Sequence, residues 1–284
     1  MTAPEMSYLI CSTPRSGSTL LCEAMINTGI AGRPEEYYQQ RQKTGLPRRP
    51  REYFEGAETD EIIEILGDVT RVDDEVSSYD SRRFDDYADY LAWTIERGTT
   101  DNGVFGAKLM WGYFNGFISH LRDLPGRAEM RPAELLPSVF PNLRFVWVTR
   151  DDKVRQGVSL WKALQTWTWR RDASDGTVVQ GDLRYSFDAI DHLVHTIQLE
   201  ELAWHGYFSE LEVEPYTVVY ERFAELYEEV ALEIIEFLGI EHTGDVVFRA
   251  REMAPQSDDL SEEWVARYCA EDMRRAAKRT VEGR

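Results

Sequence analysis

The feature that most constrains the fold is the stretch CSTPRSGSTL at residues 11–20, together with its flanks. The apolar residues YLI precede it, and the apolar-periodic segment LLCEAMI follows it. We interpret residues 7–12 as a buried strand and residues 17–29 as a helix. A strand, a short loop and a helix in this order direct backbone N–H groups and the positive end of the helix dipole toward one point. The stretch therefore predicts an anion-binding loop.

Strand-like and helix-like patterns alternate along the rest of the chain. Apolar runs of strand length recur at 103–111, 142–150 and 215–220. Helical patterns follow at about 60–66, 83–97, 112–123, 152–169, 186–210, 221–239 and from 261 onward. Such alternation favours an α/β fold with a central parallel sheet flanked by helices, in which ligands bind at the carboxyl ends of the strands. Three polar stretches, 12–19, 150 onward and 220 onward, follow such ends and are expected to share one site.

Charge and cysteine content restrict the class of ligand and the compartment. The 284 residues carry a formal net charge of −19, which argues against a general nucleic-acid or anionic-membrane surface. An anionic ligand must therefore be held by a local cluster of donors. Three cysteines in no recognised spacing indicate free thiols, no run approaches the ~18 apolar residues of a membrane span, and the N-terminus lacks a signal-peptide pattern. We expect a cytoplasmic protein.

The anion loop differs from the loop that binds nucleoside triphosphates. Donors cluster at residues 15–19, and Gly17 permits close backbone approach. In the pattern G-x-x-x-x-G-K-[ST], Gly17 and Thr19 match, but Ser12 and Ser18 replace the first glycine and the lysine. An ATP-dependent kinase is therefore disfavoured, although it is kept as an alternative. A plain serine-rich helix cap is the other alternative, and it would not need so many donors.

A second cation follows the third predicted strand. Arg150 ends that strand, and Ser159 lies nine residues later on the next predicted helix. A guanidinium and a hydroxyl at a strand end can bind a second phosphate. Alternatively, Arg150 pairs with Asp151 or Asp152. Because the first loop already predicts one anion site, we prefer a second anion site at Arg150 to an ion pair with Asp151 or Asp152.

Two phosphate sites without a lysine in the loop now point to a family. The segments TPRSGSTLL and VVYERF and the Arg150-x8-Ser159 spacing resemble the sulfotransferases that use 3′-phosphoadenosine 5′-phosphosulfate (PAPS), closest to the bacterial Stf-zero type. The resemblance extends over AGRPEEYYQ, GAKLMW, LWKALQTWTWR and SEEWVARY. It implies a P-loop-like sulfotransferase fold, one domain over residues 1–284 with a variable insertion at about 40–100, PAPS as cofactor and no metal.

The resemblance also implies roles for individual residues. The 5′-phosphosulfate would be bound by Arg15, Ser16, Gly17, Ser18 and Thr19, and the 3′-phosphate and adenine end by Arg150, Ser159 and Tyr220. Glu36 matches the glutamate that serves as general base, and only the resemblance separates it from Glu35. Lys108, together with Arg15, would neutralise the transferring group or the leaving phosphate. The alternative for Lys108 is a surface lysine at a strand edge.

The resemblance implies that the acceptor is a hydroxyl of a carbohydrate or glycosylated small molecule, and a trehalose-like glucoside is the first candidate. Aromatic faces stack on sugar rings, so we expect Glu36, Tyr37, Gln39 and Trp111 to contact it, and we note Trp167 and Trp169 nearby in the sequence. Trp161 is expected in the core. The resemblance implies a homodimer. A non-catalytic nucleotide-binding protein remains the second alternative to the enzyme.

Overall fold

The computed structural model describes residues 3–40, 47–67, 84, 86–166, 183–242, 244, 246–249 and 258–282. They fall into two compact units. The first takes its described residues from Met1–Arg48, Asp74–Asp151 and Glu200–Arg251, and the second from Arg49–Asp73, Asp152–Leu199 and Glu252–Arg284. Trp167 and Trp169 lie outside the described residues.

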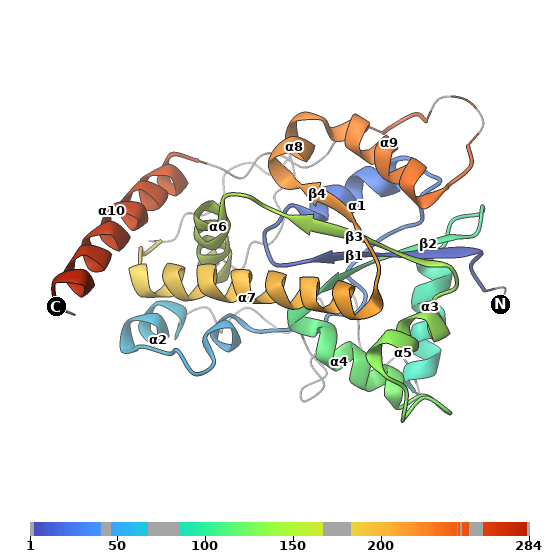
Figure 1. Ribbon diagram of the computed structural model, residues 1–284, viewed down its shortest axis with the longest axis horizontal. Coiled ribbons are helices and arrows are strands. Elements are labelled where there is room, and N and C mark those ends of the chain that lie inside the picture. The colour runs from blue at the N-terminus through green and yellow to red at the C-terminus, as the bar shows by residue number, and fades with distance from the viewer. Residues whose placement is uncertain are drawn as a thin grey trace. The chain divides into compact units, whose positions relative to one another are not determined.

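A four-stranded parallel sheet forms the centre of the first unit (Figure 1). Its strands are β1 (Met6–Ser12), β2 (Val104–Met110), β3 (Leu143–Thr149) and β4 (Tyr216–Val219), in the order β2-β1-β3-β4. This confirms the predicted α/β fold. Since β1 pairs with β2 on one side and with β3 on the other, the strand order reverses at β1. In open α/β sheets the carboxyl end of such a strand is where ligands bind.

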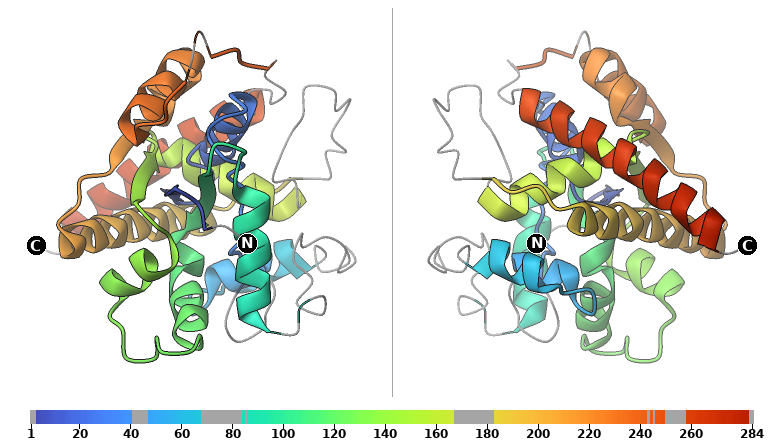
Figure 2. Two further views of the ribbon diagram at one scale, coloured as in Figure 1. Left: turned by 90° about the vertical axis from the view of Figure 1, so that its right-hand side faces the viewer. Right: turned by 90° about the vertical axis from the view of Figure 1, so that its left-hand side faces the viewer.

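Helices cover both faces of this sheet (Figures 1 and 2). One face carries α1 (Ser18–Asn27), α8 (Tyr220–Glu225) and α9 (Tyr227–Leu238). The other carries α4 (Trp111–Arg122), α5 (Pro132–Val139) and the C-terminal part of α7 (Phe187–Leu211), with α3 (Tyr87–Gly98) beside β2. Because strand side chains alternate, Leu9 and Cys11 enter the aromatic cluster under α4 and α7, whereas Lys108 faces α1.

The second unit is helical and has a core of its own. It contains the short 3-10 helix η1 (Pro50–Phe54), α2 (Asp60–Gly67), α6 (Lys153–Thr166), the N-terminal part of α7 and α10 (Asp259–Glu282), which packs on α6. Trp161 is fully buried there, meets Phe54 edge-on at 5.7 Å, and donates from Nε1 to the Arg184 carbonyl at 2.8 Å. Its expected core position is confirmed. Within the described part of the chain, no helix is long and apolar enough to cross a bilayer.

Two elements differ from the sequence-based expectation. The single helix expected over 221–239 is two helices, because the backbone leaves helical geometry at Leu226 (φ −114°, ψ 52°). The helix α5 forms in a segment to which we assigned no element. Its first turn begins with Pro132 and is closed by Glu134, which accepts from the Arg131 backbone N–H at 3.1 Å.

Candidate functional site

The loop after β1 has the backbone of an anion cradle. Gly17 caps α1 with φ +93°, and Arg15 is also left-handed, with φ +62°. The N-cap residue of α1 is Gly17, which has no side chain that could cap the first turn, and this argues against the plain serine-rich helix cap. The Ser16 hydroxyl is buried and has no hydrogen-bond partner among the described residues. Left-handed backbone at a non-glycine residue is costly and concentrates at functional loops.

Tyr220 connects this cradle to Arg150. A Cβ atom placed on Gly17 would lie 2.3 Å from Cδ2 of the Tyr220 ring, so the ring packs directly on the glycine. On the same tyrosine, the Arg150 guanidinium lies 4.7 Å from the ring centroid. The ends of β1, β3 and β4 thus meet around one aromatic ring, as expected from the parallel topology.

Arg150 is held by an acidic residue other than the two we considered. Its Nε lies 3.6 Å from Oε1 of Glu221, and the Asp151 backbone N–H donates to the same carboxylate at 3.0 Å. Asp152 instead lies 2.7 Å from Nε of Arg155. The Ser159 side chain is half-buried on α6, in the second unit, so its contribution to a site with Arg150 stays a prediction.

The backbone separates the two neighbouring glutamates, Glu35 and Glu36. The Lys108 N–H donates to the Glu35 carbonyl at 2.9 Å, so this segment lies against the edge of β2 like a short extra strand. Gly32, with φ +70°, allows the approach, since a Cβ there would lie 2.7 Å from the Gly106 nitrogen. Successive side chains of an extended chain point to opposite sides. The Glu35 carboxylate therefore turns outward to Arg97, at 3.2 Å, while Glu36 turns inward.

Lys108 joins Glu36 to the cradle. Its Nζ lies 2.7 Å from Oε2 of Glu36 and donates to Oγ1 of Thr19 at 3.2 Å. The residue is 5% exposed, which excludes the surface-lysine alternative. Burial lowers the pKa of Lys108 and Arg15 lowers it further, but the Glu36 carboxylate outweighs both, so the pKa stands above its usual value. Lys108 is therefore a cation at neutral pH, within the field of a second cation.

The other residues predicted to contact the acceptor occupy different environments. Tyr37 is 3% exposed, and its hydroxyl donates to the Arg33 carbonyl at 2.8 Å, so burial disfavours direct contact with an acceptor. Burial also raises its pKa. Trp111 and Gln39 are half-buried. Sequence reasoning missed Glu200, a buried carboxylate next to Arg48. Nothing in the sequence distinguishes it from the other acids.

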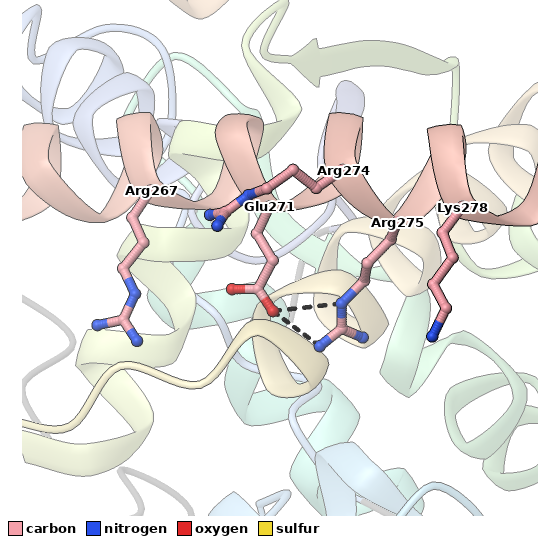
Figure 3. A pocket seen from close by; sticks show the side chains of 5 residues that line it. All are labelled: Arg267, Glu271, Arg274, Arg275 and Lys278. Atoms are coloured by element: carbon pink, nitrogen blue, oxygen red, sulfur yellow. Dashed lines mark hydrogen bonds and ion pairs between the residues drawn. The ribbon is translucent and has the colours of Figure 1, made fainter.

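A hollow on α10 does not share residues with this site. It is lined by Arg267, Glu271, Arg274, Arg275 and Lys278 (Figure 3). Arg275 is paired with Glu271 at 2.8 Å and with Asp188 at 2.7 Å, and Arg267 lies 3.8 Å from the centroid of the Tyr185 ring. These contacts are those of a salt-bridged helix surface.

Comparison with known proteins identifies the class that the fold and cradle suggest. The family model for Stf0 sulphotransferase matches residues 7–271, nearly the whole chain. The chain belongs to the Stf0 sulphotransferase family and is a sulfotransferase.

Its relatives include two mycobacterial enzymes. The trehalose 2-sulfotransferase of Mycolicibacterium smegmatis is 31% identical over 269 residues, which cover 92% of this chain and 94% of that protein. The trehalose 2-sulfotransferase of Mycobacterium tuberculosis (strain Erdman) is 31% identical over 268 residues, or 93% and 94% of the two chains. This chain is a distant homologue of both.

Two solved structures also resemble the chain. One is a sulfotransferase domain from the curacin biosynthetic pathway. The match covers 86% of this chain and 76% of that domain's chain, with a TM-score of 0.45 at 14% identity. A sulfotransferase domain from the Synechococcus PCC 7002 olefin synthase matches 95% and 96% of the two chains, with a TM-score of 0.41 at 14% identity.

Proposed function

We propose that this protein transfers a sulfuryl group from PAPS to a hydroxyl of a carbohydrate or glycosylated small molecule, with Glu36 as general base. The observation that carries the proposal is Lys108, whose Nζ contacts both Glu36 and Thr19. Through this one ammonium, the carboxylate that would take a proton lies beside the loop that would hold the transferring group.

The residues of the cradle fit the phosphosulfate of PAPS. The unpartnered Ser16 hydroxyl and the N–H groups at the start of α1 are donors for anionic oxygens. Arg15, Gly17, Ser18 and Thr19 complete this end of the donor site. For the 3′-phosphate we propose Arg150 and Ser159, with Tyr220 between Arg150 and the cradle. The Arg150 guanidinium would then exchange part of its contact with Glu221 for the phosphate.

The chemistry assigned to the chain is proton removal and charge stabilisation. PAPS supplies the sulfuryl group and leaves as adenosine 3′,5′-bisphosphate. Glu36 would accept the proton of the acceptor hydroxyl while the hydroxyl oxygen forms a bond to sulfur and the bond between sulfur and the 5′-phosphate oxygen breaks. Lys108 and Arg15 stabilise the negative charge that grows on the leaving phosphate. The Lys108 ammonium pairs with Glu36 and holds its carboxylate in position.

Trehalose or a related glucoside is the first acceptor to test, because both curated relatives are named for trehalose. Trp111 and Gln39 are half-buried and suit a sugar site, and Tyr37 supports the segment that carries Glu36. We also propose a homodimer, as the resemblance implies. The free thiols Cys11, Cys22 and Cys269 favour a reducing compartment such as the cytoplasm.

The test is an assay of adenosine 3′,5′-bisphosphate formation from PAPS with a panel of sugars that includes trehalose, with mass spectrometry for +SO₃ products. Glu36→Gln should lower kcat by about 100-fold or more and leave the affinity for adenosine 3′,5′-bisphosphate unchanged, as expected for loss of a general base. The matched control is Glu35→Gln, because that carboxylate faces Arg97 and should be dispensable for turnover. Normal turnover by Glu36→Gln would assign the base elsewhere, and no product with any sugar would refute the proposed acceptor class.

A further inference from the structure

Glu200 lies level with the carboxyl ends of the strands. The helix α7 runs antiparallel to β3: Phe208 packs on Phe145, with ring centroids 5.6 Å apart, whereas Oε1 of Glu201 accepts from the Thr149 hydroxyl at 2.7 Å. Lower residue numbers on α7 therefore lie nearer the edge of the sheet where ligands bind. Glu200 is the next residue toward that edge.

The same helix contacts the strand that leads into the cradle. The Trp204 indole Nε1 donates to the Ser12 carbonyl at 3.0 Å, at the end of β1. Glu200 is four residues away on α7, about 6 Å along the helix axis and on the same face. The carboxylate is thus one helical turn from the residue that precedes the anion loop.

The Glu200 carboxylate is buried but only partly satisfied. The residue is 8% exposed, and its Oε1 lies 3.6 Å from Nη1 of Arg48. Its Oε2 is buried and has no hydrogen-bond partner among the described residues. A buried carboxylate oxygen without a partner is costly and calls for a ligand. The chemistry assigned to Glu36 and Lys108 does not use this group.

The Arg48–Glu200 pair lies next to a glycine, Gly112, and near an aromatic ring, that of Trp111. A Cβ on Gly112 would lie 3.2 Å from Nη1 of Arg48 and 3.5 Å from Oε1 of Glu200, and Gly112 itself is exposed. The adjacent Trp111 is half-buried; it stacks on Phe114, with centroids 4.8 Å apart. The site thus combines a carboxylate that can accept hydrogen bonds, a guanidinium that can donate them and an aromatic ring, next to a residue without a side chain. Such a set of groups suits the binding of a polyhydroxylated ring.

We propose that Arg48, Gly112 and Glu200 form a hydroxyl-binding subsite for the acceptor. Glu200 accepts a hydrogen bond from one acceptor hydroxyl and Arg48 donates to a neighbouring oxygen, and Gly112, which has no side chain, lets both groups pack closely against the start of α4. This proposal rests on the proposed sulfotransferase activity toward carbohydrates and deepens it, because it names residues that select the acceptor without taking part in sulfuryl transfer.

The test compares acceptor and donor affinities in three variants, Glu200→Gln, Arg48→Leu and Gly112→Ala. With trehalose, or the sugar of the panel that is turned over best, each should raise the acceptor KM about tenfold or more. The KM for PAPS and the affinity for adenosine 3′,5′-bisphosphate should change less than twofold. Glu201→Gln is the matched control, because it removes the neighbouring carboxylate, which is bonded to Thr149. Thermal melts identify variants that fail to fold. If Arg48→Leu or Gly112→Ala fails to fold, the result for Glu200→Gln, which is the smallest change, tests the proposal.

Direct sugar binding separates this proposal from the proposed function. Sugars of the same panel are titrated into the wild-type protein and into Glu200→Gln, each with adenosine 3′,5′-bisphosphate present, and tryptophan fluorescence is recorded. Weaker sugar binding in Glu200→Gln supports the subsite even where turnover is absent. Sulfated product with an unchanged acceptor KM in Glu200→Gln and Gly112→Ala overturns the subsite alone. Absence of both sugar binding and turnover in the wild-type protein overturns both proposals.

Discussion

At the scale of single residues, the site depends on the partners of its buried charges. Lys108 is 5% exposed and has an anion and a hydroxyl within contact distance, whereas Glu200 is 8% exposed and has one cation, 3.6 Å from Oε1, and no partner for Oε2 among the described residues. The first arrangement satisfies a buried charge, and the second leaves a cost that a ligand can offset.

The pKa of Glu200 makes this cost measurable. Burial raises the pKa from 4.5 to about 7, although Arg48 opposes the shift. A carboxyl with a raised folded-state pKa favours folding below pH 4.5, and that contribution is lost as the pH rises to about 7. Glu200→Gln should therefore gain stability relative to the wild type as the pH rises from about 4.5 to 7, by up to about 3 kcal/mol in total. Chemical unfolding of both proteins at several pH values measures this difference in the free energy of unfolding. A difference that does not change with pH would contradict the prediction.

Residue patterns predicted the cradle better than the acceptor side. Gly17 and its neighbouring donors form a local signal, because strand, loop and helix follow one another in the chain. Glu36 was separated from Glu35 only by resemblance, since the direction of each side chain depends on the pairing of this segment with β2. The Arg48–Glu200 pair joins residues that are far apart in the sequence, so no local sequence pattern predicts it.

At the scale of secondary-structure elements, the contact of α1 with the Tyr220 ring makes Gly17 irreplaceable. Gly17→Ala would add a methyl group 2.3 Å from the ring at a backbone φ of +93°, so the ring or the loop must move. We expect the affinity for adenosine 3′,5′-bisphosphate, measured by calorimetry, to fall at least about tenfold, since the cradle depends on this geometry.

Gly29 provides a matched control within the same segment of chain. It also has a positive φ, +72°, but nothing lies within 4 Å of a Cβ placed there. Gly29→Ala should cost about 1–2 kcal/mol of stability from backbone strain alone and leave nucleotide affinity unchanged. Equal losses of affinity in both variants would show that strain, and not the Tyr220 contact, is responsible.

The elements themselves followed their sequence patterns where the signal was local. All four strands appear at the expected positions because each is a short, mostly apolar run between polar segments. The break at Leu226 and the helix at Pro132–Val139 were not expected. The first interrupts an otherwise helical pattern, and the second has only two fully buried residues, Leu135 and Leu136, so its apolar periodicity is weak.

At the scale of the whole molecule, the net charge of −19 opposes the approach of an anionic donor. The local cations Arg15, Lys108 and Arg150 act over a few ångströms, whereas the overall repulsion acts over longer distances and is screened by salt. Raising the ionic strength from about 10 to 150 mM should therefore speed association of adenosine 3′,5′-bisphosphate several-fold. Stopped-flow fluorescence measures the rate, and slower association with added salt would show that the local cations dominate at long range.

The position of Lys108 also has a consequence for the sequence of events in turnover. One ammonium is shared by Glu36, the proposed base, and the cradle, so a bound donor that attracts the ammonium loosens its contact with Glu36. The Glu36 carboxylate then becomes available to an acceptor hydroxyl only after the donor has bound. We expect compulsory-order kinetics with the donor first, in which adenosine 3′,5′-bisphosphate inhibits competitively against PAPS and not against the sugar. A random-order pattern would mean that the two halves of the site act independently.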